Sequence, residues 1–518
     1  MAPRVLAVFA VVLLAGCSST PAPSCDPLLW SGCCDSTGQC QAGNTLSACG
    51  AQGLACDVCV SPQVCSAGKC GGAGGGSGAG GGSGVGGGAG GGGGAGGGAG
   101  GGTAIVNTGT FPDITNGDNG RHPQLIIDAT GKRHLFYEQL LGKETNGTIP
   151  FRYGECTTNC GVASSWQFAS VGNRDTFGSL GKLALNAQGK PRVMWFKADA
   201  TSAPPVLYFG SCDSNCTTAA SWTTAPILTL ANSNSIYSRT GRNLSIDGTG
   251  RAHFVFAQNG LYYMTCASNC TAPSAWSAPL ELLNDAAKVS LATTATGQVR
   301  LAFTSQGGQL LTYRTCESGC DVLTNWSAEA LLRNSYEGQV SLRLDAQGRP
   351  RIFYNESGTG APPSRNSLYG WCDSSCGTPG SWPFVTIGLP SGDGEKGLDF
   401  DLHAGGEVSV ALQTAAYELA VVRCLSSCQS LSGMWTRVVV ETSDSVKAEV
   451  SPPLPNCSNF NPPKQPYAYW TPGEQVTGSV NPLTGKLEVA HRTYTDAKCG
   501  FTGTVYEGVT IPRFSGPF

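Results

Sequence analysis

Basic side chains recur at one position of a repeated sequence block, and together they could bind an anionic ligand. Each block contains a turn that ends in glycine, and in five of six blocks the third residue after this glycine is basic or titratable. The six residues are His134, Arg192, His253, Arg300, Arg351 and Ser409. If the blocks surround an axis, the five basic groups would circle one opening and could contact carboxylates or acidic sugars. The alternative is that each begins a strand and is solvated or paired locally.

Paired cysteines form the second recurring set. Each pair has three residues between its cysteines and is followed by a tryptophan, after five residues in five copies and after six in the last. The copies are Cys156, Cys160, Trp166; Cys212, Cys216, Trp222; Cys266, Cys270, Trp276; Cys316, Cys320, Trp326; Cys372, Cys376, Trp382; and Cys424, Cys428, Trp435. No histidine adjoins a pair, so we predict six local disulfides that fix loop shape, with no metal and no cofactor. The tryptophans are expected in the core, with a sugar-stacking platform as the alternative.

The elements that position these residues are short β-strands. Alternating apolar residues flank the glycine turn in segments such as 125–137, 183–195, 244–256 and 342–354, which is typical of hairpins. A third strand runs into the first cysteine, as at 206–209, and a fourth follows the tryptophan. The first cysteines are 50 to 56 residues apart, and four antiparallel strands in each such period indicate the blades of an all-β propeller.

The number of blades depends on how the C-terminal segment is interpreted. Six units occupy residues 121–442, and the tail contains further strand candidates. We expect the tail to form a divergent seventh blade, with a disulfide between Cys457 and Cys499. Segment 104–111 would add a strand to that blade and close the ring. The alternative is six blades with a C-terminal extension.

Blocks such as 245–250, with Phe254 and Phe256 behind them, resemble the BNR or Asp-box repeats of sialidase-like propellers. The resemblance covers most of 103–518, although the glycine falls one position later than in an Asp box. It implies the propeller fold. A sialidase-like hydrolase would also need an arginine cluster, a tyrosine nucleophile with a glutamate, and an acidic donor. The family's N-terminal arginine motif is absent, since Arg121 precedes His122-Pro123, and no G-x-S-x-G, H-E-x-x-H or phosphate-binding motif is found.

The N-terminus is predicted to direct export and lipidation. Arg4 precedes a short apolar run at 5–14, which is too short to span a bilayer, and Leu14-Ala15-Gly16-Cys17 resembles a bacterial lipobox. The resemblance implies a signal peptide at 1–17, acylation of Cys17, and anchoring to the outer membrane or cell surface. Ordinary secretion with a free Cys17 is the alternative.

Between this signal and the propeller we expect two further segments. Residues 25–70 contain nine cysteines and resemble a cysteine-rich module of exported myxobacterial proteins; we predict disulfides there, with zinc at Cys56 and Cys59 as the alternative. Because nine is odd, at least one of these thiols has no partner within the module. Residues 71–102 are almost entirely glycine and predict a flexible linker before the propeller at 103–518.

Composition limits the classes of function. The chain has 518 residues, a net charge of -3 and 13% charged residues, so it has no basic footprint for nucleic acid. Its 24 cysteines favour an oxidising compartment. We therefore expect a monomeric, lipid-anchored surface protein that binds a glycan or a protein without catalysis. The alternative is a divergent sialidase-like glycoside hydrolase or lyase.

Overall fold

A computed structural model of the chain divides it into two compact units, Met1–Ala99 and Gly100–Phe518. The residues that the structure describes are 33–34, 40–41, 44–45, 48–49, 63–66, 69–72, 107–108, 119–139, 149–174, 181–197, 204–230, 241–258, 260–305, 310–334, 339–357, 365–390, 398–414, 416–430, 435–449, 457–458, 466–499 and 505–518.

In the first unit, three two-stranded antiparallel sheets are described. They pair β1 (Cys33–Cys34) with β2 (Cys40–Gln41), β3 (Asn44–Thr45) with β4 (Ala48–Cys49), and β5 (Gln63–Ser66) with β6 (Lys69–Gly72). Cys17 and the glycine linker from residue 73 onward lie outside the described residues, and the described backbone of the module does not test how its cysteines pair. These predictions stay untested.

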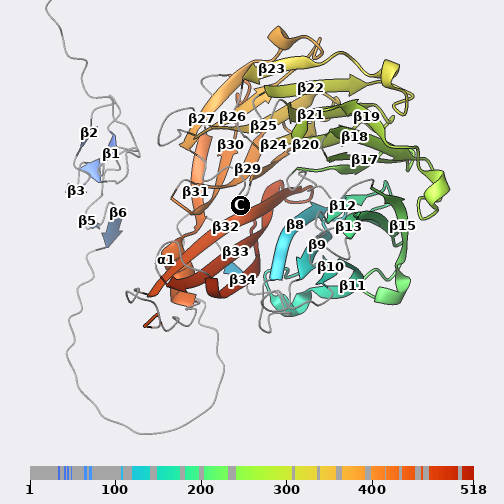
Figure 1. The fold of residues 1–518 in the computed structure, drawn as a ribbon. Helices are drawn as coiled ribbons and strands as arrows, with labels where there is room; N and C mark the ends of the chain where they lie inside the picture. The colour runs from blue at the N-terminus through green and yellow to red at the C-terminus, as the bar shows by residue number, and fades with distance from the viewer. Residues whose placement is uncertain are drawn as a thin grey trace, which may run out of the picture. The chain divides into compact units, whose positions relative to one another are not determined.

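Six antiparallel four-stranded sheets, here called blades 1 to 6, follow one another around a ring in the second unit (Figure 1). Blade 1 contains β8 (Asn119–Ile127), β9 (Arg133–Gln139), β10 (Ile149–Cys156) and β11 (Gln167–Arg174); blade 2 contains β12 (Lys182–Leu185), β13 (Pro191–Lys197), β14 (Val206–Ser211) and β15 (Thr223–Thr229); blade 3 contains β16 (Leu244–Ile246), β17 (Ala252–Ala257), β18 (Leu261–Cys266) and β19 (Leu280–Leu283). Blade 4 contains β20 (Ala286–Thr293), β21 (Val299–Ser305), β22 (Leu310–Cys316) and β23 (Ala330–Asn334); blade 5 contains β24 (Val340–Leu344), β25 (Pro350–Ser357), β26 (Arg365–Trp371) and β27 (Phe384–Pro390); blade 6 contains β28 (Leu398–Leu402), β29 (Val408–Gln413), β30 (Leu419–Cys424) and β31 (Trp435–Glu441).

A seventh four-stranded sheet, here called sheet 7, joins the C-terminal segment to a strand that precedes blade 1. Its order is β32 (Pro466–Asn481), β33 (Lys486–Cys499), β34 (Val505–Ser515) and β7 (Asn107–Thr108), and Phe514 pairs with Thr108. Strand β32 contacts both β28 and β8, so sheet 7 closes the ring. Cys457 and Cys499 form the predicted disulfide. The predicted propeller of four-stranded sheets is confirmed, with six repeat blades and sheet 7 where the divergent blade was expected.

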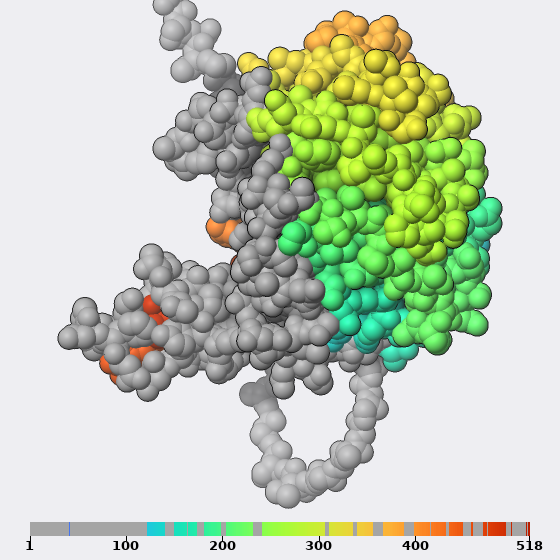
Figure 2. Space-filling view, turned by 45° about the vertical axis from the view of Figure 1, so that its right-hand side comes forward, coloured from blue at the N-terminus to red at the C-terminus, as the bar shows by residue number. Residues whose placement is uncertain are grey.

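The core lies between neighbouring blades. One cluster joins Leu311 and Tyr313, on the third strand of blade 4, to Leu342 and Ile352, on the first two strands of blade 5, and all four are fully buried. The blades stack side by side around the outside of the ring (Figure 2). Because strand side chains alternate between the two faces of a sheet, each blade packs one apolar face against the blade before it and one against the blade after it.

The tryptophan column forms part of this inter-blade core, as expected. Each tryptophan packs against an aromatic residue on the third strand of the preceding sheet, with ring centroids 4.9 to 5.9 Å apart. The pairs are Phe514 with Trp166, Tyr153 with Trp222, Phe209 with Trp276, Tyr263 with Trp326, Tyr313 with Trp382, and Tyr369 with Trp435.

Helical structure is scarce in the described residues. A helix α1 (Ser443–Glu449) links blade 6 to sheet 7, and short 3₁₀ turns precede the tryptophans of blades 1 to 5. In the part of the chain that the structure describes, no helix has the length and apolar character needed to cross a bilayer.

Candidate functional site

The turn between strands 1 and 2 and the loop between strands 3 and 4 lie at the same end of every blade, because adjacent strands are antiparallel. We call this end the disulfide face. All six predicted local disulfides lie on it: Cys156–Cys160, Cys212–Cys216, Cys266–Cys270, Cys316–Cys320, Cys372–Cys376 and Cys424–Cys428.

The six disulfide loops share one conformation. In each loop the residue before the second cysteine has a positive φ, between 52° and 58°, and asparagine occupies this position in three loops, at 159, 215 and 269. Asparagine, serine and glycine tolerate this left-handed region better than bulky or β-branched residues do. In blades 1 to 5 the tryptophan indole N–H donates to the carbonyl oxygen of the second cysteine, at 2.7 to 2.9 Å. The residues between the cysteines are exposed, so the face presents six copies of one clamped loop.

The two histidines of the basic column are buried and make matching contacts. His134 is 0% exposed; its Nδ1 lies 2.6 Å from the Tyr153 hydroxyl and its Nε2 lies 3.2 Å from Asp128 Oδ2. His253 is 2% exposed, and the corresponding distances to Tyr263 and Asp247 are 2.6 and 3.1 Å. Each imidazole therefore ties the strand 1–2 turn to the third strand of its own blade.

The arginines of the column pair with carboxylates of the turn or of the disulfide loop. Arg351, which is 1% exposed, donates to Asp345 Oδ2 at 2.7 Å, to Asp373 Oδ1 at 2.8 Å and to the Cys372 carbonyl at 3.0 Å. Arg192 pairs with Asp213 at 2.8 Å and Arg300 with Glu317 at 2.9 Å.

The contacts of all six residues in the basic column are therefore local, as the alternative to a ligand role predicts. In the sixth block, Ser409 Oγ lies 2.7 Å from His403 Nε2. Only Arg192 and Arg300 keep part of their side chains exposed, 17% and 12% respectively. The predicted ligand role stays untested, and these two arginines are the members of the column that a ligand could reach.

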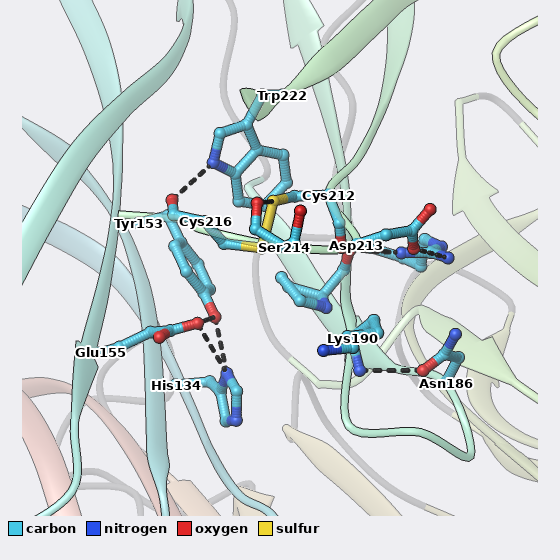
Figure 3. Close-up of a disulfide and its surroundings, with 12 residues drawn as sticks. His134, Tyr153, Glu155, Asn186, Lys190, Cys212, Asp213, Ser214, Cys216 and Trp222 are labelled. Carbon is cyan, nitrogen blue, oxygen red and sulfur yellow. Dashed lines mark hydrogen bonds and ion pairs between the residues drawn. A yellow bond between two sulfur atoms is a disulfide. The ribbon is translucent and has the colours of Figure 1, made fainter. Parts of the chain in front are cut away.

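A hydrogen-bonded row crosses from blade 1 toward the disulfide loop of blade 2 (Figure 3). It contains His134, the Tyr153 hydroxyl, and Glu155, whose Oε1 accepts from that hydroxyl at 2.8 Å. Burial lowers the pKa of His134, although the Asp128 hydrogen bond and the Glu155 charge oppose this effect. Burial, reinforced by Glu155, raises the pKa of Tyr153 far above its usual value.

This tyrosine and glutamate are the residue types that a sialidase-like hydrolase would use as its nucleophile pair. However, Tyr153 is 0% exposed, and its ring packs edge-on against Trp222 at 5.0 Å. A substrate cannot reach a hydroxyl in this position, so the row is a structural element of the blade 1–2 interface.

The innermost strands carry polar residues in register along the axial channel. Seven sheets place Gln124, Lys182, Asn243, Ser290, Ser341, Asp399 and Thr477 at the same strand position. Several of these side chains accept a hydrogen bond from the backbone of the next innermost strand: Ser290 from Leu342 N at 3.0 Å, Asp399 from Gly478 N at 3.2 Å, and Thr477 from Leu125 N at 3.3 Å. An innermost strand is a sheet edge, and these contacts satisfy amides that the sheet leaves unpaired.

Charged side chains line and cross the channel at this level. Arg343 Nη2 donates to Asp399 Oδ1 at 2.5 Å, and Arg242, from blade 3, donates to the Gly478 carbonyl at 3.1 Å and lies 4.0 Å from Asp399. Burial raises the pKa of Asp399. The charges of Arg343 and Arg242 and the hydrogen bonds from Gly478 and Ser341 lower it by more than burial raises it, so the pKa is below its usual 3.8.

Lys182 is the most unusual of these charges. It is 1% exposed and its Nζ donates to the Gly241 carbonyl at 2.9 Å. Burial lowers its pKa to about 8, against the opposing effect of Asp399 and Glu138. The described residues contain no group of three or more histidine, cysteine or acidic side chains placed to hold a metal ion.

Sequence reasoning missed the channel charges. A signal for them existed, because the innermost-strand position is polar in all seven sheets while its neighbours in the chain are mostly apolar. That column mixes amide, hydroxyl and charged side chains, so it is less conspicuous than the basic column. Contacts such as that of Arg242 with sheet 7 depend on the ring being closed and cannot be inferred from spacing.

Comparison with solved structures finds distant propellers. The BP39L lectin of Burkholderia pseudomallei is 10% identical, with a TM-score of 0.42 over 78% of this chain and 97% of that chain. The NanB sialidase of Streptococcus pneumoniae is 11% identical, with a TM-score of 0.40 over 79% and 70%. An ulvan lyase of polysaccharide lyase family PL25 is 10% identical, with a TM-score of 0.46 over 80% and 96%.

No protein-family model and no curated protein matches the chain. The solved structures are too dissimilar to carry an argument about ligand or activity. The assignment of this chain to the β-propellers therefore rests on its own ring of four-stranded sheets.

Proposed function

We propose that this protein is a lipid-anchored surface protein whose propeller binds a glycan or protein ligand at the disulfide face and does not catalyse a reaction. The observation that carries the proposal is the presence of six copies of one clamped loop on a single face. Loops fixed by disulfides lose little conformational entropy when they bind, which favours affinity. Repeated loops also suit a ligand with repeated units, because several weak contacts then act together.

Two features argue for binding without catalysis. The Tyr153 hydroxyl, which donates to Glu155, is buried between blades 1 and 2, and the channel below the face is crossed by Arg242 and lined by the Arg343–Asp399 ion pair. A ligand would therefore rest on the face and would not be held in a deep cavity among acid and base groups, as hydrolysis would require.

The test for binding is a glycan array probed with the oxidised full chain, followed by mass spectrometry of every glycan that binds. Binding with the glycan recovered intact supports the proposal. Shortened or unsaturated products would instead establish a hydrolase or a lyase. If no glycan binds, affinity capture with purified, defined surface proteins as probes tests whether the ligand is a protein. Failure of this capture as well would refute the binding role.

The anchor is tested separately, by labelling with a radioactive fatty acid and by membrane fractionation. We expect the native chain to incorporate the label and to sediment with the outer membrane. Cys17→Ser should abolish both, while Cys457→Ser, a matched loss of one cysteine, should keep the label. A labelled Cys17→Ser chain would refute acylation at that residue.

A further inference from the structure

The strand 1–2 turns of the seven sheets lie around the channel mouth on the disulfide face, and we call them together the turn collar. Its members are residues 128–131, 186–189, 247–250, 294–297, 345–348, 403–406 and 481–485. Several neighbouring turns touch one another. A methyl group on Gly131 would lie 2.7 Å from Leu483, one on Gly189 would lie 3.2 Å from Asp128 Oδ2, and Gly248 N donates to the Ala295 carbonyl at 3.1 Å.

The residue directly after the turn glycine is a cation in five of the seven sheets. These residues are Lys132, Lys190, Arg251, Arg349 and Lys486, while Gln298 and Glu407 occupy the other two positions. This column is distinct from the basic column two residues further on, whose side chains are buried or paired. Arg251 is exposed, and Lys190 and Lys486 are partly exposed.

The cations differ in how far their charges are neutralised. Lys132 pairs with Glu155 at 2.6 Å, and Arg349 pairs with Asp345 at 2.8 Å and with Asp373 at 3.3 Å. Within the described part of the chain, Lys190, Arg251 and Lys486 have no carboxylate within ion-pair distance. Three cations on the collar, in blade 2, blade 3 and sheet 7, are therefore available to pair with a ligand. The other two, Lys132 and Arg349, already pair with local carboxylates.

The carboxylates of the disulfide loops lie further from the axis than the collar, whose own Asp128, Asp247 and Asp345 accept hydrogen bonds from backbone amides of their turns. Asp213 is 76% exposed and Glu317 is 59% exposed, and both belong to disulfide loops between strands 3 and 4, whereas the collar adjoins the innermost strand. The described part of the face therefore has three cations without a carboxylate partner on the collar and exposed carboxylates toward its rim. Such a charge pattern attracts a narrow anionic chain across the centre and repels a broad polyanion that would also cover the rim.

We propose that the turn collar binds an acidic polysaccharide, whose carboxylate or sulfate groups contact Lys190, Arg251 and Lys486 and are assisted by Lys132 and Arg349. This inference rests on the proposed binding function of the disulfide face and names the ligand class. A polysaccharide fits better than a nucleic acid, because the whole chain carries a net charge of -3 and the rim carboxylates would oppose the width of a duplex.

The experiment measures dissociation constants of the oxidised full chain by isothermal titration calorimetry. The probes are polygalacturonate, dextran sulfate, uncharged dextran of the same size and a single-stranded DNA of about the same charge. We expect the two acidic polysaccharides to bind, more weakly as NaCl increases, and uncharged dextran not to bind. The first two probes separate carboxylate from sulfate recognition.

Three variants locate the site. The triple variant Lys190→Gln, Arg251→Gln, Lys486→Gln should weaken binding roughly 3- to 100-fold, because one exposed ion pair changes an affinity about 1.4- to 5-fold. The matched control Arg333→Gln, Arg437→Gln, Lys447→Gln removes the same charge from β23, β31 and α1, away from the collar, and should leave affinity unchanged. Gln298→Lys adds a sixth cation to the collar and should strengthen binding by about 1.4- to 5-fold, which misfolding could not cause.

The outcomes separate this inference from the proposed function. If a neutral glycan binds and the collar triple variant binds it as tightly, the binding function stands and the acidic-ligand inference is wrong. If the DNA binds as tightly as dextran sulfate, the collar recognises any polyanion and the assignment to polysaccharides is wrong. If the control variant weakens binding as much as the collar variant, only net charge matters and the collar is not the site.

Discussion

Replacing Asp399 should show how strongly the channel charges hold the ring together. This carboxylate accepts from Arg343 at 2.5 Å, Ser341 at 2.9 Å, Thr477 at 3.1 Å and Gly478 N at 3.2 Å. One side chain of blade 6 thus contacts blade 5 and sheet 7. Asp399→Ala removes all four contacts and leaves the Arg343 guanidinium, whose side chain is 8% exposed, without its closest carboxylate.

The expected cost follows from the burial of Arg343. Breaking a buried ion pair by removing one partner costs about 3–5 kcal/mol, and Asp401, 3.7 Å from Arg343 Nε, should keep the loss near the lower value. A unit of about 400 residues has an unfolding entropy near 0.9 kcal/mol/K. Asp399→Ala should therefore lower the Tm by about 3 to 5 °C at pH 7.

The assay is differential scanning calorimetry of the oxidised chain, with Asp321→Ala as control because Asp321 is exposed on a disulfide loop. The pKa of Asp399 is below its unfolded value, so its stabilising contribution is complete above about pH 4 and is lost as pH falls through the lower, folded pKa. The difference in Tm between wild type and variant should shrink below pH 4. Equal Tm values at pH 7, or a difference that does not shrink in acid, would refute the reasoning.

Three further predictions concern stability and use the same calorimetric assay. Burial depresses the pKa of Lys182 to about 8, so wild-type stability should fall as pH drops from about 10.5 to about 8. Lys182→Met should therefore have a higher Tm than the wild type at pH 7, and this difference should close near pH 10.5. A lower Tm for the variant at pH 7 would contradict this reasoning. Replacing Cys316 and Cys320 together by serine opens a loop with a sequence separation of 4, so we expect the free energy of unfolding to fall by about 2 kcal/mol. Complete unfolding of this variant would show that the disulfide does more than restrict the unfolded chain. Trp326→Ala should cost about 3–5 kcal/mol because the ring is 6% exposed and packs on Tyr263 of blade 3, and an unchanged Tm would remove this column from the core.

Much of the fold could be predicted because each unit repeats short-range patterns. The Cys-x3-Cys pairs, the glycine turns and the period of 50 to 56 residues were enough to predict the blades, and segment 104–111 was correctly expected to join the last sheet, through β7. Apart from the β7–β34 pairing, these features depend on residues that are neighbours in the chain or lie in the adjacent hairpin.

The candidate site was harder to predict, because the partners that decide a side chain's role come from elsewhere. His134 is equivalent in sequence to Arg192, yet it is enclosed by Tyr153 and Asp128, whereas Arg192 remains partly exposed beside Asp213. Sequence spacing identified the basic column without showing which members reach solvent. The cations after the turn glycines were overlooked, since their significance depends on the turns meeting at one collar.

The composition of sheet 7 has a consequence for how the chain folds. Strand β7 comes from before blade 1, whereas its partner β34 ends three residues before the C-terminus. Blades 1 to 6 are each built from one continuous stretch of chain and can form in order as the polypeptide emerges. Sheet 7 cannot form until β34 has been made, and joining such distant segments is slow because loop closure is entropically costly. Until then, the exposed side of blade 1 is an aggregation risk during synthesis. A truncation that removes part of β34 should harm folding far more than its length suggests.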